Sequence, residues 1–246
     1  MNTEGEVTMS ICGKKVVVLG GSSGMGLATA QAVAEQGGHV IIASRSEQKL
    51  KNAAEKIKKN VETYVLDVTD EKAVQEFFDK VGSFDHLAST AAGGPSGDFL
   101  ELPISEAKKT FESKFWGQYY AAKYGAPSIN PGGSITFCTG ILSNRPSKGF
   151  SILSSINGGI EALARAIAIE LSPIRVNVVS PGIVDTPLWG GLPEEERKAY
   201  FQSVRNQLPV KRMGKPDDIA HAMLYLMTNE FTTGTVLEVN GGHFLV

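Results

Sequence analysis

A glycine-rich turn directly follows the first β-branched run of the sequence. Gly20, Gly24 and Gly26 have the spacing G-x-x-x-G-x-G, and a segment with helical periodicity follows at about 25–36. Such a turn lets backbone N–H groups approach a pyrophosphate at the positive end of a helix. A three-glycine match alone also fits an ordinary strand-to-helix turn, but its place between predicted strands favours a dinucleotide site. The residues predicted to hold the phosphates are Gly20, Ser22, Ser23, Gly24, Met25 and Gly26.

The end of the second predicted strand, 40–43, indicates which dinucleotide is bound. Ser44 and Arg45 stand there, and neither is acidic. A carboxylate would accept hydrogen bonds from a ribose 2′-hydroxyl, whereas Ser44 and Arg45 offer donors to a 2′-phosphate. We therefore predict NADP(H) as the cofactor. The alternative is a solvated arginine at the start of a helix.

The sequence resembles the short-chain dehydrogenase/reductase family over about residues 14–242. Its glycine spacing is that of the family and differs from the G-x-G-x-x-G of larger dehydrogenases, although Leu19 replaces the usual Thr. Asp67-Val68 follows the third predicted strand, as in the family, and PGIVDTP at 181–187 is similar to its PG-x-x-x-T segment. The run STAAG at 89–93 takes the place of the family's N-N-A-G.

The resemblance implies further cofactor contacts. Asp67 and its neighbour would contact the adenine, while backbone groups near Val184 and the Thr186 hydroxyl would meet the nicotinamide amide. We expect Ser89 and Thr90 to supply hydrogen bonds in place of two asparagines that normally brace the central strand. The residues assigned to the cofactor beyond the glycine turn are Ser44, Arg45, Asp67, Val68, Thr90, Ala91, Pro181, Gly182, Val184 and Thr186.

Every member of the family's catalytic tetrad is replaced. Aligned on the residues after the family's Y-x-x-x-K, Leu153 stands at the Tyr position and Asn157 at the Lys position. Gly140 stands at the Ser position, and Lys114 at the Asn position. The sequence therefore keeps the family's frame without its usual phenolic acid.

A second Y-x-x-x-K match, at 119–123, does not restore the tetrad. It lies in the helix after the fourth predicted strand, and Tyr119 is five residues beyond Lys114. Five residues turn a side chain ~140° around the helix axis, so Tyr119 cannot share the direction of Lys114. We expect Tyr119 to pack between helices and Lys123 to be solvated.

Lysine and asparagine have exchanged places, because the family has Asn and then Lys where this chain has Lys114 and then Asn157. We expect the Lys114 ammonium to enter the same pocket from the opposite wall, held by Asn157, and to contact the ribose or the substrate. The alternative is that Lys114 reaches solvent and Asn157 caps local backbone. Lys114 is the first choice of proton donor, since burial lowers an ammonium pKa.

Hydroxyl groups near these positions are candidate oxyanion stabilisers, because they donate hydrogen bonds but are poor proton sources. Thr139, Ser154 and Ser155 are of this kind. The predicted catalytic residues are Lys114, Asn157, Thr139 and Ser154. An anionic or aromatic substrate could meet Arg145, Lys148 and Trp116, although such residues also serve as surface charges or core packing.

The elements that must position these residues alternate between short β-branched runs and helical patterns. Strands are expected at about 16–19, 40–43, 61–66, 86–90, 134–138, 176–179 and 236–239, and helices at about 25–36, 46–58, 71–81, 105–125, 153–171 and 217–228. This alternation predicts one α/β domain, a doubly wound parallel sheet of about seven strands with helices on both faces. An insert at 186–210 holds Trp189, Leu192, Tyr200 and Phe201 and is a candidate substrate lid.

The bulk properties of the 246-residue chain exclude several classes of function. The formal net charge is −2, and 42% of residues are hydrophobic. Without a basic run, neither nucleic acid nor an anionic membrane is an expected partner. We also expect no signal peptide, no membrane span and no metal site, and Cys12 and Cys138 should be inert buried thiols of a cytoplasmic protein. The family resemblance implies a homotetramer or homodimer formed by the helices at about 105–125 and 153–171 and by the last strand.

Three functions fit these observations. The first is an NADP(H)-dependent oxidoreductase of a small carbonyl, alcohol or activated alkene compound with a non-standard proton donor. The second is an NADP(H)-binding sensor or partner subunit without turnover. The third is a non-redox isomerase or lyase on the same fold, since a fold does not determine a function.

Overall fold

Seven parallel strands form one sheet in the order β3-β2-β1-β4-β5-β6-β7, in a computed structural model that describes residues 10–91 and 94–246. The strands are β1 (Lys15–Leu19), β2 (His39–Ser44), β3 (Val61–Val65), β4 (Phe84–Ser89), β5 (Ile129–Cys138), β6 (Arg175–Pro181) and β7 (Val236–Val239). The order reverses at β1, with β2 and β3 on one side and β4 on the other. Ligands of doubly wound sheets bind at the carboxyl ends of the strands beside such a reversal. The predicted fold class is confirmed.

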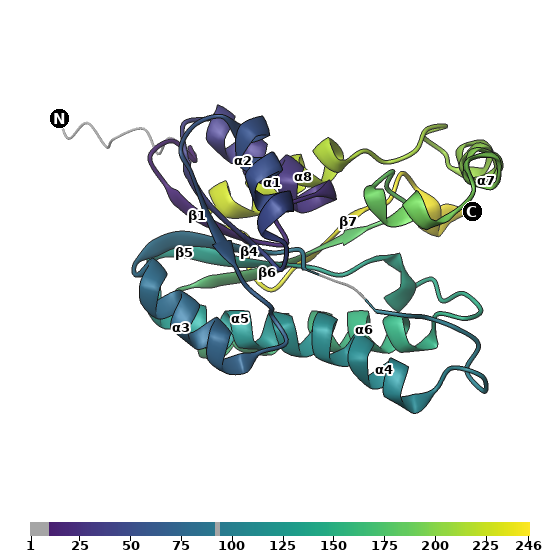
Figure 1. Cartoon of the computed structure of the whole chain (residues 1–246), viewed down its shortest axis with the longest axis horizontal. Helices are drawn as coiled ribbons and strands as arrows, with labels where there is room; N and C mark the ends of the chain where they lie inside the picture. Colours follow the sequence, from purple (N-terminus) through teal and green to yellow (C-terminus); the bar gives the residue numbers. More distant parts are fainter. Residues whose placement is uncertain (1–9, 92–93) are drawn as a thin grey trace.

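Helices cover both faces of the sheet (Figure 1). One face carries α1 (Gly24–Glu35), α2 (Glu47–Ile57) and α8 (Pro216–Thr228), and the other carries α3 (Glu71–Val81), α4 (Ile104–Phe111), α5 (Gly117–Gly125) and α6 (Ser151–Glu170). α7 (Glu194–Gln207) lies beside the C-terminus, beyond the carboxyl ends of β6 and β7. Buried apolar residues form a separate core on each face of the sheet. The central strand is buried on both faces, because Val16, Val17 and Val18 are fully inaccessible.

The long helix expected at 105–125 is broken in its middle. Between α4 and α5 lies a π-helical turn, η1 (Glu112–Trp116), with Lys114 at its centre. The Gln118 side chain amide donates to the Lys114 carbonyl (3.1 Å) and to the Cys138 carbonyl (3.3 Å), and it accepts from the Cys138 N–H (3.2 Å). Gln118 thus joins the π turn to the end of β5. Such turns are frequent at functional sites.

The outer face of α6 is apolar and exposed. An 18-residue window of this helix has a mean hydropathy of 1.3, and only 28% of it is buried, so length and composition alone would suit a membrane span. Length and composition alone do not test the expectation that the protein has no membrane span. The helix packs against β6, with Asn157 and Glu161 buried on its inner side and Ile169 81% exposed on its outer side.

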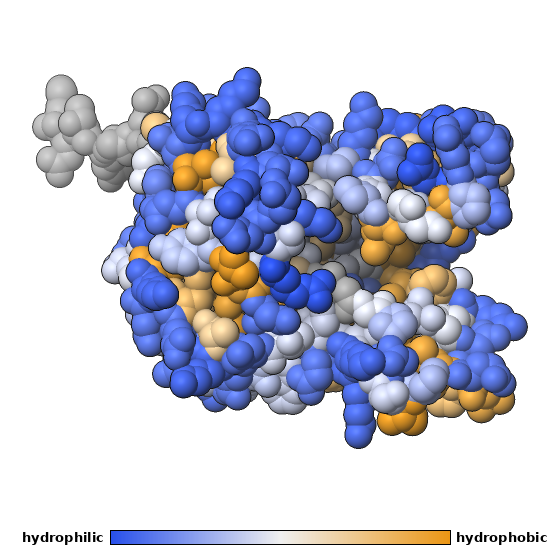
Figure 2. All heavy atoms as spheres, viewed as in Figure 1, coloured by the Kyte–Doolittle hydropathy of each residue, from blue (hydrophilic) through white to orange (hydrophobic). Residues whose placement is uncertain are grey.

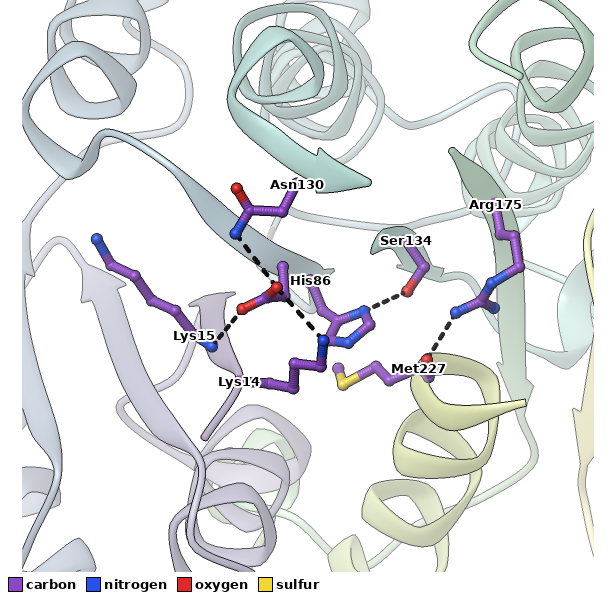
Figure 3. A network of polar contacts seen from close by, with 8 residues as sticks. Lys14, Lys15, His86, Asn130, Ser134, Arg175 and Met227 are labelled. Carbon is purple, nitrogen blue, oxygen red and sulfur yellow. Dashed lines mark hydrogen bonds and ion pairs between the residues drawn. The ribbon is translucent and has the colours of Figure 1, made fainter. Parts of the chain in front are cut away.

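A row of polar residues crosses the sheet near the amino ends of its central strands (Figure 3). His86, Ser134 and Arg175 are register partners on β4, β5 and β6. The His86 ring Nδ1 is 2.9 Å from the Ser134 hydroxyl, and Arg175 donates to the carbonyls of Leu226 and Met227 at 2.6 Å each. This row ties the end of α8 to the sheet at the edge opposite the glycine turn.

Candidate dinucleotide and proton-transfer site

The glycine turn is packed so closely that side chains at its glycines would collide with backbone. Gly20 has φ +82° and Gly24 has φ +54°, in the left-handed region that favours glycine. A Cβ on Gly26 would lie 2.4 Å from the Gly20 carbonyl oxygen, and one on Gly20 would lie 2.7 Å from the Ala91 nitrogen. The turn therefore brings the start of α1 against the end of β4, as a close backbone approach to phosphates requires.

Thr90 binds the residue that directly precedes this turn. Its hydroxyl donates to the Leu19 carbonyl (2.9 Å), which also accepts from the Thr90 N–H (2.9 Å). The hydrogen bond expected from Thr90 is thus present. It uses the same Thr90 hydroxyl that we assigned to cofactor binding. For Ser89 the expectation is wrong: its buried hydroxyl has no hydrogen-bond partner among the described residues. Ala91 adjoins Gly20, whereas Ala92 and Gly93 lie outside the described residues.

The segment after β6 faces the glycine turn, as the resemblance implies. A Cβ on Gly24 would lie 3.6 Å from Thr186, and one on Gly182 would collide with Asn240 at 2.8 Å. The Val184 carbonyl accepts from the Trp189 indole N–H (2.9 Å). The turn and the segment from Pro181 to Thr186, which are 155 or more residues apart in the printed sequence, thus form two sides of one site.

Ser44 and Arg45 lie at the carboxyl end of β2, beside the glycine turn. The Ser44 hydroxyl is buried and has no hydrogen-bond partner among the described residues, and Arg45 is exposed. The next residue, Ser46, caps α2 by accepting from the Lys49 N–H. A buried hydroxyl without a partner next to a guanidinium fits an additional phosphate. With the glycine contacts, these residues fit an NADP(H) molecule.

The two residues predicted to contact the adenine, Asp67 and Val68, also make contacts within the protein. One oxygen of the exposed Asp67 carboxylate accepts from the backbone N–H (3.0 Å) and the hydroxyl (2.9 Å) of Thr69. Val68 packs against the start of α5, where a Cβ on Gly117 would lie 2.8 Å from its Cγ2. Both residues are held at the carboxyl end of β3.

Lys114 is buried at the carboxyl end of β5. Its side chain is 8% exposed, and its Nζ donates to the Thr139 carbonyl at 3.1 Å. Burial lowers the pKa of the ammonium; Cys138, at a pH where its thiol is ionised, and Glu161 oppose this effect. The alternative, a lysine that reaches solvent, is wrong. A buried ammonium with a lowered pKa can release its proton closer to neutral pH than a surface lysine can.

Asn157 lies beside Lys114 but does not hold it directly. Its side chain amide donates to the Gly140 carbonyl (2.9 Å), the residue after the one that Lys114 contacts. The expected Lys114–Asn157 hydrogen bond is absent among the described residues, because each group binds one of two successive carbonyls. The Asn157 Oδ1 and the Ser154 hydroxyl are buried without partners in the described part of the chain. Of these two residues, Asn157 lies beside Gly140.

A buried carboxylate completes this cluster, and the sequence reasoning missed it. Glu161, one helical turn after Asn157 on α6, is 6% exposed. It accepts from the Ser143 hydroxyl (2.7 Å) and from the Thr139 hydroxyl (3.3 Å). The hydroxyl proton of Thr139 is therefore engaged by Glu161, away from the oxyanion role that we assigned to it. The i, i+4 spacing from Asn157 was the signal available in the sequence.

Three residues expected to meet a substrate have other contacts. Arg145 donates to the carbonyls of His243 and Val246, and Lys148 pairs with Asp98 at 3.3 Å. Trp116 packs edge-on against Tyr119, 5.3 Å between ring centroids. Tyr119 therefore packs on aromatic residues of the adjoining turn η1, and its predicted packing between helices stays a prediction.

The two cysteines differ from each other. Cys138 is buried, and burial raises its pKa to about 11. Cys12 is exposed, so the expectation of two buried thiols is wrong for it. Both are unpaired, and the described residues contain no cluster of three potential metal ligands.

Comparison with known protein sequences agrees with this geometry. A family model described as enoyl-(acyl carrier protein) reductase matches residues 20–243. A short-chain dehydrogenase/reductase of Stachybotrys chlorohalonatus is 32% identical, over 96% of this chain and 99% of the relative. Another, of Malbranchea aurantiaca, is 30% identical over 95% of each chain.

Comparison with solved structures also finds a dehydrogenase and a reductase with a similar fold. A small-chain dehydrogenase crystallised with NADPH is 36% identical, with a TM-score of 0.81 over 95% of this chain and 99% of that one. The MalC reductase/Diels-Alderase of Malbranchea aurantiaca is 28% identical, with a TM-score of 0.90 over 96% and 98% of the two chains. Because the family model and these relatives span nearly the whole sequence, the chain belongs to the short-chain dehydrogenase/reductase family of oxidoreductases.

Proposed function

We propose that this protein is an NADP(H)-dependent reductase of a small, fairly apolar carbonyl or activated alkene compound, with Lys114 as the proton donor. The observation that carries the proposal is the buried Lys114 ammonium at the Thr139 carbonyl, next to Gly140 in the place of the family's serine. It puts an acid beside the position from which the usual hydroxyl is missing. Leu153, at the tyrosine position, has no proton to give.

Selectivity for NADP(H) is supported by two kinds of observation. The Ser44 hydroxyl without a partner and the exposed Arg45 stand where a 2′-phosphate would need donors. A 36% identical relative was crystallised with NADPH. When bound, the cofactor supplies a hydride to the substrate carbon and becomes NADP⁺.

The chain's own residues then complete the electron and proton balance. As the C=O or C=C π bond breaks, its electron pair moves to the oxygen or to the second carbon. The Lys114 N–H bond breaks, and its proton forms the O–H or C–H bond of the product. The neutral amine regains a proton from water. The Asn157 side chain lies beside Gly140, and its Oδ1 has no hydrogen-bond partner among the described residues, so we assign it to a bound hydroxyl group; the Ser154 hydroxyl, one turn earlier on α6, is likewise without a partner there.

Apolar side chains at the opening of the site support an apolar substrate. Figure 2 shows a hollow between the part that carries α7 and the part that carries α4, with hydrophobic residues on both walls. We propose that residues 186–210 are the lid of this hollow. Trp189 holds it by its bond to Val184 and by packing on Tyr200 and Phe201.

A non-redox activity is the second candidate, and one comparison favours it. The 28% identical relative with a TM-score of 0.90 is a reductase/Diels-Alderase. A ring-forming reaction needs a shaped apolar pocket and hydrogen-bond donors, which Leu153 and the Lys114 cluster could supply without hydride transfer. The same residues would then orient a substrate instead of protonating it.

Two measurements test the proposal in order. First, nucleotide fluorescence is followed while purified protein is titrated with NADPH and with NADH; we expect selective, tight binding of NADPH. Next, NADPH carrying deuterium at the transferable C4 position is mixed with a panel of ketones, aldehydes and enones. Deuterium in a product supports reduction. Tight binding with no deuterium transfer to any acceptor would favour the non-redox candidate, and no binding of either nucleotide would reject the proposed reductase activity.

We also propose that the protein is a cytoplasmic homotetramer or homodimer. Between α5 and α6 lies a groove of about 560 Å³ lined by Tyr119, Leu163, Ile167, Leu171 and Ile174, beside the apolar outer face of α6. A second copy would cover this surface through the helices that the family uses for assembly. The unpaired, exposed Cys12 fits a reducing compartment. A Cys12-linked dimer isolated from cells under alkylating conditions would contradict that location.

A further inference from the structure

Glu161 is a buried carboxylate that the proton-transfer step described above does not use. It is 6% exposed and lies on the inner side of α6, under the carboxyl end of β5. A carboxylate at such a site costs several kcal/mol unless hydrogen bonds or an opposite charge stabilise it. Its surroundings should therefore contain hydrogen-bond donors, an opposite charge, or both.

The hydrogen bonds come from two hydroxyls. Ser143, in the short helix η3 (Ile141–Ser143), donates at 2.7 Å, and Thr139 donates at 3.3 Å to the same oxygen. No basic group lies within 4 Å of this carboxylate among the described residues. Any opposite charge must therefore act from slightly farther away.

That charge is Lys114. One residue, Thr139, contacts both groups: its carbonyl accepts from the Lys114 Nζ (3.1 Å), and its hydroxyl donates to Glu161. Lys114 and Glu161 thus bind opposite ends of one residue in a buried region, where Coulomb attraction is much less screened than in water. The chain Lys114–Thr139–Glu161–Ser143 joins η1, β5, α6 and η3.

Among the described residues, two other titratable groups act on Lys114 or Glu161. Cys138 on β5 faces Lys114, but burial keeps its thiol protonated by raising its pKa to about 11. Glu238 on β7 faces Glu161, and burial together with the charge of Glu161 raises the pKa of Glu238. Glu161 is therefore the carboxylate placed to hold the Lys114 charge, whereas Glu238 acts on Glu161 and is not among the groups that shift the pKa of Lys114.

We propose that Glu161 is a positioning residue that keeps the Lys114 ammonium charged through Thr139, and so sets the pH range over which Lys114 holds a proton for the substrate. The catalytic part of this inference rests on the proposed function. The electrostatic part does not, because the charge of Lys114 exists with or without turnover. The two parts can therefore fail separately.

The test is the titration of Lys114 itself. In protein labelled with ¹⁵N-lysine, the Lys114 Nζ resonance is identified by its loss in Lys114→Arg, and its pKa is measured by NMR. Glu161→Gln keeps an oxygen for both hydroxyls and removes only the charge. We expect the Lys114 pKa to fall by about one to two units, the size expected for a buried neighbouring charge. If the protein reduces a substrate, the basic limb of its pH profile for kcat should move down equally.

Glu238→Gln is the matched control, because it removes the neighbouring carboxylate that does not contact Thr139. It should leave the Lys114 pKa unchanged. Glu161→Asp keeps the negative charge but moves it farther from Thr139, because the side chain is shorter. A smaller fall of the Lys114 pKa is therefore expected. This variant is used for the test if Glu161→Gln does not fold. An unchanged Lys114 pKa in the folded Glu161 variants, or an equal fall in Glu238→Gln, would overturn the inference. A shifted Lys114 pKa in a protein without turnover would reject the proposed function alone.

Discussion

At the scale of single residues, the site contains a buried positive charge. Lys114 lies on the π turn η1 and Asn157 lies on α6, and they bind two successive carbonyls after β5. Burial lowers the pKa of Lys114, and Glu161 opposes that effect. The exchange of lysine and asparagine that the family resemblance implies stays a prediction.

Lys114→Met should remove turnover while the fold stays intact. We expect kcat to fall by about 10²-fold or more, because a positioned proton donor contributes about that much. The Tm should stay equal or rise, since an apolar side chain replaces a buried charge. Steady-state kinetics and thermal unfolding check both. The control is Lys123→Met, which changes the exposed lysine of the formal Y-x-x-x-K match; if it lowers kcat as strongly, the assignment of Lys114 fails.

Arg45→Asp should exchange the nucleotide preference. The variant loses a charge-assisted contact with a 2′-phosphate and gains an acceptor for a ribose hydroxyl. We expect NADPH to bind about 30- to 100-fold more weakly, equivalent to about 2 to 3 kcal/mol, while NADH binding improves. Fluorescence titration measures both dissociation constants. Unchanged discrimination would show that Arg45 is a solvated residue at the start of α2.

At the scale of elements, the site depends on how helices and strands end. The π turn η1 directs Lys114 toward β5, and Gln118 ties that turn to Cys138. The 3₁₀ turn η4 (Pro187–Gly191) carries Trp189, whose indole reaches back to the Val184 carbonyl. The resemblance places the nicotinamide amide at backbone groups near Val184, so the position of η4 and the binding of the cofactor should depend on each other.

Trp189→Phe should weaken binding without unfolding the protein. Phenylalanine keeps an aromatic ring against Tyr200 and Phe201 but loses the hydrogen bond to Val184. One such bond contributes about 1 kcal/mol, so we expect KM for NADPH to rise by about five-fold with little change in Tm. Tyr200→Phe, which keeps the ring and that bond, is the control. Equal KM values in the wild type and Trp189→Phe would argue against a role of this bond in binding.

At the scale of the whole molecule, the two ends of the sheet have different tasks. The carboxyl ends carry the glycine turn and the Lys114 cluster, whereas the polar row His86, Ser134 and Arg175 near the amino ends holds α8 on the sheet (Figure 3). His86 is 4% exposed. Burial first, and then the charge of Arg175, lower its pKa to about 4.

This buried histidine makes stability depend on pH. Below the unfolded pKa of about 6.5, the unfolded chain binds a proton that folded His86 does not accept until the pH falls to about 4. The stability that neutral His86 contributes is complete above pH 6.5 and is lost as the pH falls to about 4. Between pH 7 and pH 4.5 this amounts to about 2 kcal/mol. Urea unfolding at both values, compared with His86→Gln, should show a smaller decrease in the variant; equal decreases would contradict the assignment.

The assembly is tested by a charge in the groove between α5 and α6. Ala166 lines that groove and is exposed in the single chain, so Ala166→Arg should prevent a second copy from covering it. Light scattering is expected to give a dimer or tetramer for the wild type and a monomer for the variant. Ala199→Arg, an exposed position on α7, is the control and should assemble normally. A monomeric wild type would reject the proposed assembly.

The sequence by itself determined the layers of the fold and the location of the nucleotide site. Both depend on signals that are local in the chain: runs of β-branched residues, helical periodicity, and glycines at a turn that tolerates no side chain. The seven strands predicted from 16–19 to 236–239 all exist. Side chains at Gly20 and Gly26 would collide with backbone atoms, and Gly24 has a φ of +54°. Family resemblance over most of the chain added the prediction that Lys114, Gly140, Leu153 and Asn157 stand at the positions of the catalytic tetrad.

Only the tertiary structure decided where the side chains of those positions go. Whether Lys114 meets Asn157 or a carbonyl depends on the π turn and on the end of β5, two features that no local pattern specifies. The same holds for Glu161, because its charge becomes significant only when α6 buries it under Thr139. Sequence spacing determines which residues share an element, but burial and hydrogen-bond partners arise where separate elements meet, and these control the pKa values on which the chemistry depends.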